Sequence, residues 1–314
     1  MMTRWTFWST ARLTVLGVCV LSGAAATRPL RDAAPASALW EMPADLEDRD
    51  LFFGSWGEAH APDPRDTYTF VRPKHNGVNP GVVVRDGRGR IWHVKQPPHN
   101  SQGAEGPVEV VLSRVLDAIG YHQPPVYFLP SFTLADAKGA HVVEPGGRFR
   151  LDEPSMKARG SWPWVGNALA GTRPYEGLLV ILLVFNSWDL KDSNNTIYDV
   201  RRDGGVEPWY VVRDLGAALG ETGRLAPKRN NIEKFERQTF ITGVTGGFVD
   251  FTYRGWQPRL VRGAITVEDV RWAAALLSRL SDRQWHDAFR AGGFTDNLSE
   301  RFIRKLKANI AEGR

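Results

Sequence analysis

The stretch that decides the fold of this chain runs from residue 188 to residue 195 and reads Trp-Asp-Leu-Lys-Asp-Ser-Asn-Asn. It follows directly on residues 174–185, whose almost uninterrupted apolar run predicts a buried helix. That helix is too short to cross a bilayer. A second acidic loop, Arg-Asp-Leu-Gly at residues 213–216, ends the second strand of a predicted hairpin. The two loops are therefore the first candidates for a chemical site.

The residue types in these loops suit phosphoryl transfer to a hydroxyl group. That reaction needs a carboxylate near the attacking hydroxyl, oxygen ligands for Mg²⁺ and cations on the phosphates. Asp189 supplies the carboxylate, and Asn194, five residues later, supplies an amide oxygen. Asp214 supplies a further oxygen ligand of the hard kind that Mg²⁺ accepts. Each residue alone is also common in turns, so the prediction depends on their order and spacing.

Asp-Leu-Lys-x-x-Asn followed by Asp-Leu-Gly resembles the catalytic and metal-binding loops of the protein kinase superfamily. It is also similar to the more distant HipA-type bacterial kinases and phosphatidylinositol kinases. The resemblance implies that Asp189 is the catalytic base and that Lys191 contacts the transferred phosphate. It implies that Asn194 and Asp214 are metal ligands, and that the cofactors are ATP and Mg²⁺ or Mn²⁺. Ser-Trp at residues 187–188 replaces the usual His-Arg, which indicates an atypical branch.

Upstream, Trp-His-Val-Lys at residues 92–95 ends a predicted strand. The resemblance implies that Lys95 binds the α- and β-phosphates and pairs with a glutamate on the next helix. Glu109 is the best candidate for this partner and Glu105 is the second. Glu105 is expected to precede the helix, because Pro107 suits a first helical position.

The loop that would cover the phosphates is residues 75–81, with Gly77 and Gly81 as the implied cofactor-binding glycines. Here the resemblance is weak, since the loop has no Gly-x-Gly-x-x-Gly motif. In order along the chain, the resemblance covers residues 67–216.

The expected order of elements is strands, one helix, strands, the buried helix, a hairpin and further helices. This order predicts an α+β, two-lobed protein-kinase-like fold, with a β-rich N-lobe over residues 67–156 and a helical C-lobe over residues 157–314. Asp-Gly between two apolar runs, at residues 86–87, predicts a hairpin. The expected strands are residues 67–71, 82–85, 90–95, 126–129, 141–144, 148–151, 196–198 and 209–212, with a turn at 145–147. The expected helices are residues 107–119, 174–185, 267–280, 282–291 and 298–311.

The first 26 residues have the pattern of a secretory signal peptide, with two arginines, an apolar run and small residues at the end. We therefore expect an exported protein, periplasmic or extracellular, that binds a membrane only if residues 1–26 remain as an anchor. A lipid anchor at Cys19, the single cysteine, is a further alternative. Residues 27–66 are rich in Pro, Ala and Asp and predict a linker or N-terminal arm. Its large apolar residues are expected to pack onto the body: Trp40, Leu51, Phe52, Phe53 and Trp56.

Composition narrows the class of protein further. The formal charge of +5 is small for 314 residues, and bases alternate with acids, so a nucleic-acid partner is not expected. The seven histidines are scattered, which argues against a zinc site. Twelve tryptophans leave open a carbohydrate-binding protein of the cell envelope.

The preferred function is an ATP- and metal-dependent kinase that phosphorylates a hydroxyl group of a protein, a lipid head group or a sugar. Because ATP is scarce outside the cytoplasm, the chief alternative is a catalytically inactive pseudokinase or binding module. The sequence leaves open the acceptor, the choice between phosphate and nucleotide transfer, and the oligomeric state.

Overall fold

The computed structural model describes residues 35–74, 79–98, 104–136, 138–223 and 227–314. They form one α+β unit. The predicted signal peptide, Cys19 and Gly77 lie outside the described residues. Within the described ranges, no helix is both long enough and apolar enough to span a membrane.

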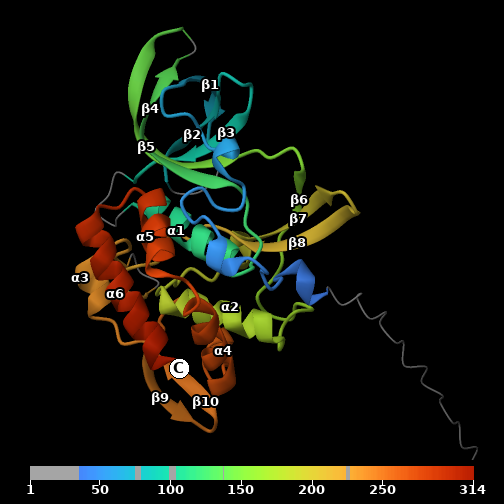
Figure 1. Ribbon diagram of the computed structural model, residues 1–314, viewed down its shortest axis with the longest axis vertical. Coiled ribbons are helices and arrows are strands. Elements are labelled where there is room, and N and C mark those ends of the chain that lie inside the picture. Colours follow the sequence, from blue (N-terminus) through green and yellow to red (C-terminus); the bar gives the residue numbers. More distant parts are fainter. Residues whose placement is uncertain (1–34, 75–78, 99–103, 137, 224–226) are drawn as a thin grey trace, which may run out of the picture. The chain divides into compact units, whose positions relative to one another are not determined.

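A closed, five-stranded β-barrel occupies one end of this unit (Figure 1). Its strands are β1 (Thr67–Pro73), β2 (Gly81–Arg85), β3 (Ile91–Lys95), β4 (Val126–Ala135) and β5 (His141–Leu151), in the order β1-β2-β3-β5-β4. The sheet closes because β1 pairs in parallel with β4, with Thr67 opposite Thr133. Alternate residues point inward, so that Tyr68, Trp92 and Phe149 fill the barrel with tilted and edge-to-face ring contacts.

Strand β5 corrects the prediction of two short strands with a turn at residues 145–147. The strand is continuous, and its two glycines lie against neighbouring backbone instead of forming a turn. A Cβ on Gly146 would lie 1.8 Å from the carbonyl oxygen of Leu129, and one on Gly147 would lie 2.1 Å from that of Lys95. Glycine is present at these two positions because the neighbouring strands approach closely. The sequence alone did not distinguish this role from that of a turn glycine.

Helix α1 (Glu105–Ala118) lies between the barrel and the other helices (Figure 1). It begins two residues before the predicted start, so Glu105 is its first residue and the expectation that Glu105 precedes the helix is wrong. Both sides of the helix are buried: Val108 and Val111 join the large core, and Val110 packs with Val126 of β4. This position carries the acidic first turn of α1 to the end of β3.

A three-stranded antiparallel sheet follows the barrel. It has the order β6-β7-β8, from β6 (Met156–Gly160), β7 (Asn195–Arg202) and β8 (Gly205–Val212). The predicted hairpin corresponds to β7 and β8, whereas β6 was not foreseen. The two acidic loops lie at the start of β7 and at the end of β8, which pair with each other at Asn195 and Val212.

The helical part is built around α2 (Arg173–Val184), which is the predicted buried helix. The remaining elements are α3 (Ile232–Glu236), α4 (Val267–Leu277), α5 (Asp282–Ala291), α6 (Asp296–Glu312) and the hairpin of β9 (Ile241–Thr245) and β10 (Phe248–Phe251). Capping boxes at Thr266 and Ser281 fix the starts of α4 and α5. The side-chain amide of Asn309 in α6 donates to the carbonyl of Val184, which ties the last helix to the end of α2.

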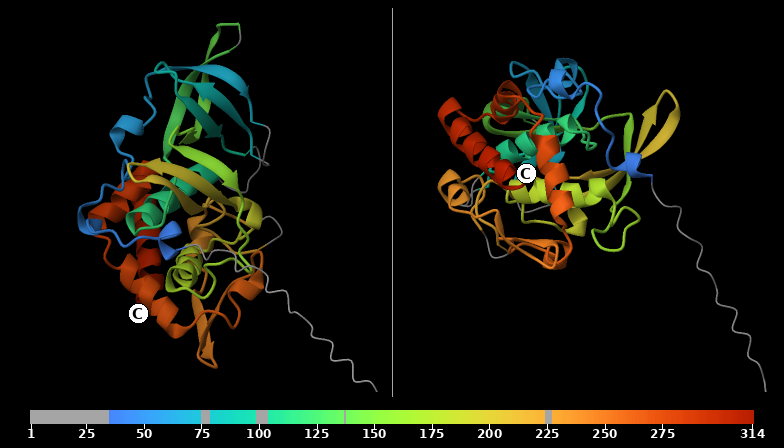
Figure 2. Two further views of the ribbon diagram at one scale, coloured as in Figure 1. Left: turned by 90° about the vertical axis from the view of Figure 1, so that its right-hand side faces the viewer. Right: turned by 60° about the horizontal axis from the view of Figure 1, so that its bottom comes forward.

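The N-terminal segment, residues 35–66, runs past α1 to the barrel (blue in Figures 1 and 2). The indole of Trp40 donates to the carbonyl of Ile119 at 2.7 Å, and that of Trp56 donates to the carbonyl of Gln123 at 3.1 Å. In the helical part, the amide of Gln284 donates to the carbonyl of Leu46. The large apolar residues of this segment contact hydrophobic clusters of the body, as expected. The segment is thus part of the folded unit over its described length.

Candidate functional site

Lys95, the last residue of β3, is at the centre of the site. Its ammonium lies 2.8 Å from Glu109 Oε2, 2.9 Å from Asp214 Oδ1 and 3.2 Å from Glu105 Oε2. The side chain is only 5% exposed. Burial lowers the pKa of Lys95, but the carboxylates of Glu109 and Asp214 raise it by more, so the residue remains a cation.

Glu109 joins Lys95 to an arginine that the sequence analysis did not identify. Its other oxygen, Oε1, lies 2.9 Å from Nε of Arg148 on β5. Arg148 also donates to the carbonyl of His93 at 3.1 Å. Burial raises the pKa of Glu109, but Arg148 and Lys95 lower it by more, so this buried carboxyl is ionised. The structure therefore places the preferred glutamate against Lys95 and adds a second cation behind it.

Glu105 is a second partner of Lys95 and links α1 to the Asp-Leu-Gly loop. Its carboxylate also accepts from the side-chain amide of Asn79 and pairs with the guanidinium of Arg229. A Cβ on Gly216 would lie 2.5 Å from the Cβ of Glu105. Glycine at this position lets the loop pass directly beside the first turn of α1.

Asp214 follows β8 with φ 53°, in the left-handed region that few non-glycine residues adopt. Such a conformation costs energy and is concentrated at functional sites. Burial raises the pKa of Asp214, but Lys95 lowers it by more, helped by Arg148 and Arg213, and the net shift is downward. Unlike that of Lys95, the side chain of Asp214 is 44% exposed. One oxygen of the Asp214 carboxylate contacts Lys95, and the side chain remains accessible from the cavity.

The loop after α2 holds Asp189 between two of its own residues. Lys191 Nζ lies 2.7 Å from Asp189 Oδ1. The amide of Asn194 donates to the backbone carbonyl of Asp189 at 2.7 Å and to its Oδ2 at 3.2 Å. The Lys191 ammonium also lies over the ring of Trp256, 4.9 Å from its centroid.

Distant segments fix the backbone of this loop. Oδ1 of Asp192 accepts from the backbone N–H of Trp164 at 2.9 Å and from the amide of Gln257 at 2.7 Å. The hydroxyl of Tyr253 donates to the carbonyl of Trp188 at 3.2 Å. The loop is thus held from both sides before any ligand binds, which favours a fixed orientation of Asp189.

A cavity of about 500 Å³ collects the side chains described above. Its lining includes Lys74, Asn79, Lys95, Glu105, Arg148, Arg150, Asp189, Lys191, Asn194, Arg213 and Asp214. Of the predicted site residues, Glu109 lies behind Lys95 and Gly81 is not in the lining. A Cβ on Gly81 would lie 2.1 Å from the carbonyl oxygen of Val94, so this glycine serves the pairing of β2 with β3.

The donor set fits one hard divalent cation. The described residues contain no group of three or more His, Cys, Asp or Glu side chains arranged for a metal. The candidate ligands are instead one carboxylate, on Asp214, and one amide, on Asn194. Because Asn194 uses its NH₂ on Asp189, its oxygen remains as an acceptor. Oxygen donors of this kind are those that Mg²⁺ accepts, usually with several waters and substrate phosphates.

His93 belongs to a cationic surface above the cavity, on the outer face of the barrel. Burial lowers its pKa to about 4, and Arg150 adds to this shift. Asp152 opposes it, while Arg72 and Arg148 lower the pKa further. At neutral pH His93 is therefore uncharged, which limits the positive charge of this surface.

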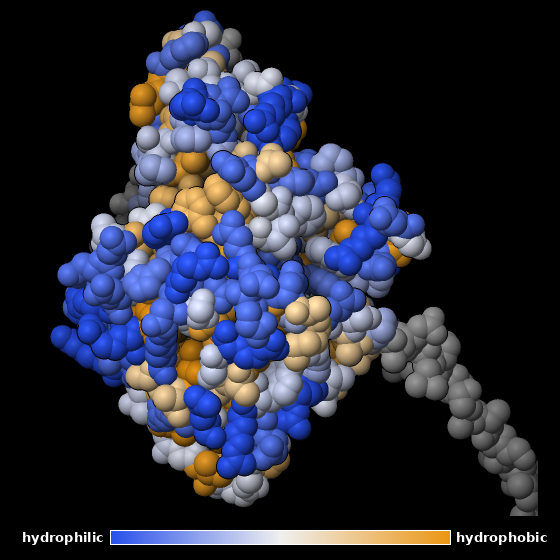
Figure 3. Space-filling view, in the orientation of Figure 1, coloured by the Kyte–Doolittle hydropathy of each residue, from blue (hydrophilic) through white to orange (hydrophobic). Residues whose placement is uncertain are grey.

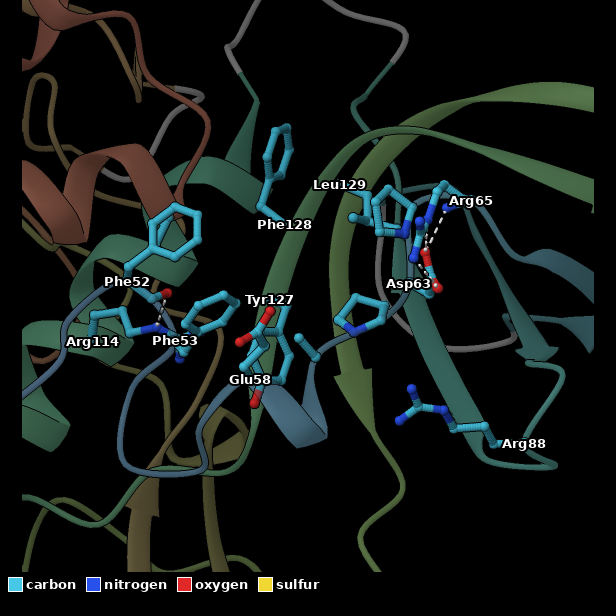
Figure 4. A pocket seen from close by; sticks show the side chains of 14 residues that line it. Phe52, Phe53, Glu58, Asp63, Arg65, Arg88, Arg114, Tyr127, Phe128 and Leu129 are labelled. Atoms are coloured by element: carbon cyan, nitrogen blue, oxygen red, sulfur yellow. Dashed lines mark hydrogen bonds and ion pairs between the residues drawn. The ribbon is translucent and has the colours of Figure 1, made fainter.

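A separate cavity of about 410 Å³ lies between the N-terminal segment and β4 (Figure 4). Phe52, Phe53 and Tyr127 line one side of it, and the ion pair of Arg65 with Asp63 lies on the other. None of the residues predicted for catalysis or for cofactor binding lines this cavity. Elsewhere, the face in Figure 3 is largely hydrophilic, with hydrophobic residues in small separate groups.

Replacing Glu109 by glutamine should lower the free energy of unfolding by about 3 kcal/mol, because it leaves buried cations with fewer counter-charges. Chemical denaturation at neutral pH measures this. The matched control is Glu207→Gln, which removes an exposed carboxylate 3.9 Å from Arg202 and should change the value by less than about 0.5 kcal/mol. Equal effects of the two changes would contradict the central role of Glu109.

The lowered pKa of His93 predicts a pH dependence of stability. Below its ordinary value of 6.5 the unfolded chain takes up a proton that the folded chain refuses until about pH 4. Stability should therefore fall as the pH drops through this window, and His93→Gln should make that fall shallower. Urea unfolding at several pH values measures the slope, with the exposed His141→Gln as control. A slope unchanged by His93→Gln would show that this histidine is not held neutral.

Comparisons with known proteins do not assign the chain to a family. No family model matches the chain, and no curated protein matches it. Among solved structures, it is similar to the crystal structure of a Helicobacter pylori proinflammatory kinase, CtkA. The match has a TM-score of 0.44 and 8% sequence identity, over 78% of this chain and 92% of that one. A match of this size decides neither the family nor the chemistry.

Proposed function

We propose that this chain is an atypical kinase with a two-lobed, protein-kinase-like fold that uses ATP with Mg²⁺ or Mn²⁺. One observation carries the proposal. Lys95, the loop residues Asp189 and Asn194, and Asp214 come from three separate parts of the chain, and all of them line one cavity of about 500 Å³. In this assignment the barrel and α1 form the N-lobe, and the elements from β6 onward form the C-lobe.

The contacts of each side chain support the roles that the resemblance implies. Asp189, held by Asn194 and Lys191, would orient the acceptor hydroxyl and accept its proton. Lys95 would bind donor phosphates, with Glu109 fixing the ammonium from behind. Asp214 and Asn194 would hold the divalent cation, which when bound neutralises charge on the phosphates. Lys191, partly exposed beside Asp189, would contact the transferred group.

The proposed acceptor is defined only by its chemical class. It is a hydroxyl group on a protein, a lipid head group or a sugar. Of the described tryptophans, Trp256 is the most exposed, at 38%, while Trp92, Trp162, Trp164 and Trp285 are fully buried. Most tryptophans therefore serve the core, and nothing in their arrangement favours a carbohydrate-binding surface. The exported location is likewise a proposal, since residues 1–26 lie outside the described part of the chain.

One observation favours a second candidate, a nucleotide-binding module without catalysis. Lys95 is 5% exposed and already contacts three carboxylates, so a phosphate would have to compete for its ammonium. If that competition fails, the cavity would bind its ligand without aligning it for transfer. Slow hydrolysis of bound ATP in the absence of an acceptor distinguishes an enzyme from such a module.

Metal-dependent nucleotide binding is the first prediction of this function. ATP with Mn²⁺ at about 100 times its dissociation constant should stabilise the purified full chain by about 2.7 kcal/mol, a shift of roughly 5 °C in thermal unfolding. Asp214→Asn should abolish the metal-dependent part of the shift because it removes the ionised ligand.

The control is Asp203→Asn, an exposed carboxylate in the turn between β7 and β8. It should leave the shift unchanged. No shift in the wild type at millimolar ATP and Mn²⁺, or an equal shift in Asp214→Asn, would contradict the proposed function.

A further inference from the structure

The register of β3 with β5 gathers basic side chains on the outer face of the barrel. His93 lies opposite Arg150, and Lys95 lies opposite Arg148. Between them on β5, Phe149 points into the barrel core. Because side chains alternate along a strand, these four residues share the opposite face. That face borders the cavity through Lys95, Arg148 and Arg150.

The charges on this face are compensated at one end only. Lys95 and Arg148 share the carboxylate of Glu109. Arg150, although partly buried, makes no ion pair and no side-chain hydrogen bond with any described residue. Burial lowers its pKa to about 10, and Arg148 and Arg213 add to the effect. It therefore remains a cation at neutral pH. The charge of Glu109 opposes the downward shift, but no carboxylate of the described residues forms an ion pair with Arg150.

Arg213 is a second cation that forms no ion pair with a described residue. Its side chain donates to the hydroxyl of Tyr198 at 3.3 Å, while its Nε is buried without a hydrogen-bond partner. The nearest strongly acidic neighbour along the chain, Asp214, directs Oδ1 to Lys95. Buried or partly buried charges are costly unless paired, so two adjacent guanidinium groups that form no ion pair with a described residue indicate a place for an anion.

The two arginines also lie where two cavities meet. Both line the cavity of about 500 Å³ that contains Asp189 and Asp214, and both line a neighbouring cavity of about 170 Å³. The smaller cavity is walled by Asp152 and Met156, in and just after the connection from β5 to β6. A ligand that extended from one cavity to the other would pass directly along Arg150 and Arg213.

We propose that Arg150 and Arg213 form a phosphate-binding point at this junction, separate from Lys95 and Asp214. Guanidinium groups present planar donors that match phosphate oxygens, often in bidentate fashion. The phosphate-containing ligand would then be held at two points, at these arginines and, with one end of its phosphate chain, at Lys95. Only the placement of that end at Lys95 rests on the proposed function. The same chemistry serves a nucleotide and an inorganic polyphosphate.

Calorimetric titration of the full chain without divalent metal tests this point, using tripolyphosphate, ATP and adenosine as separate ligands. Tripolyphosphate should bind, and Arg150→Gln should weaken its binding at least tenfold. Arg201→Gln is the matched control, because it removes an exposed guanidinium from β7 outside both cavities and should have little effect. Arg150→Lys, which keeps the charge but loses the planar donors, should fall between them.

The ligands distinguish the two sources of phosphate. Equal losses for ATP and tripolyphosphate in Arg150→Gln would support a nucleotide donor, and a loss for tripolyphosphate alone would support an inorganic one. A loss for adenosine or for ATP alone would overturn the proposal, because the arginine would then recognise the nucleoside. Wild-type tripolyphosphate binding in Arg150→Gln would overturn it as well, as would an equal loss in Arg201→Gln.

The same titration separates this inference from the proposed function. Asp214→Asn should remove metal-dependent ATP binding but retain metal-free tripolyphosphate binding that depends on Arg150. If the proposed function fails while the Arg150-dependent binding persists, the anion site stands alone. Thermal unfolding of Arg150→Gln checks folding, and its midpoint should be unchanged or higher, since the change relieves repulsion between like charges.

Discussion

The buried ammonium of Lys95 is the interaction on which the site depends. It contacts both α1, through Glu105 and Glu109, and the loop after β8, through Asp214. A cation buried to this degree is tolerated only with close counter-charges, so the position of each of these elements constrains the others. Gly216 completes the arrangement by allowing the Asp-Leu-Gly loop to lie directly against Glu105. The geometry of the cavity thus follows from satisfying one charge.

The sequence was sufficient where a local pattern determines the structure. The apolar run of α2 and the loops around Asp189 and Asp214 could be predicted, because an apolar run and short spacings carry this information. The glutamate partner of Lys95 came from the resemblance to protein kinases. Closure of the barrel could not be predicted, since the parallel pairing of β1 with β4 joins residues that are 66 positions apart. Arg148 and Arg150 were missed for a related reason. Their positions on either side of Phe149 indicate that both face the cavity only when β5 is known to be one continuous strand that borders it.

The basic face of the barrel distinguishes this cavity from one that binds only an uncharged, apolar ligand. Arg148 is paired with Glu109, whereas Arg150 and Arg213 form no ion pair with any described residue. His93 adds no charge at neutral pH because burial and Arg150 keep it deprotonated. The balance of charge therefore changes along the cavity, from carboxylates paired with lysines at Asp189 and Asp214 to a guanidinium without an ion pair at Arg150. Such a gradient suits a ligand with several phosphate groups and a metal at one end.

The most direct test of the central claim is a crystal structure of the full chain with Mn²⁺ and a non-hydrolysable ATP analogue, using anomalous scattering to locate the metal. We predict a manganese peak bonded to the Asp214 carboxylate and the Asn194 amide oxygen, with analogue phosphates beside Lys95. A metal and nucleotide bound elsewhere, with Lys95 and Asp214 still paired and the cavity empty, would contradict the account.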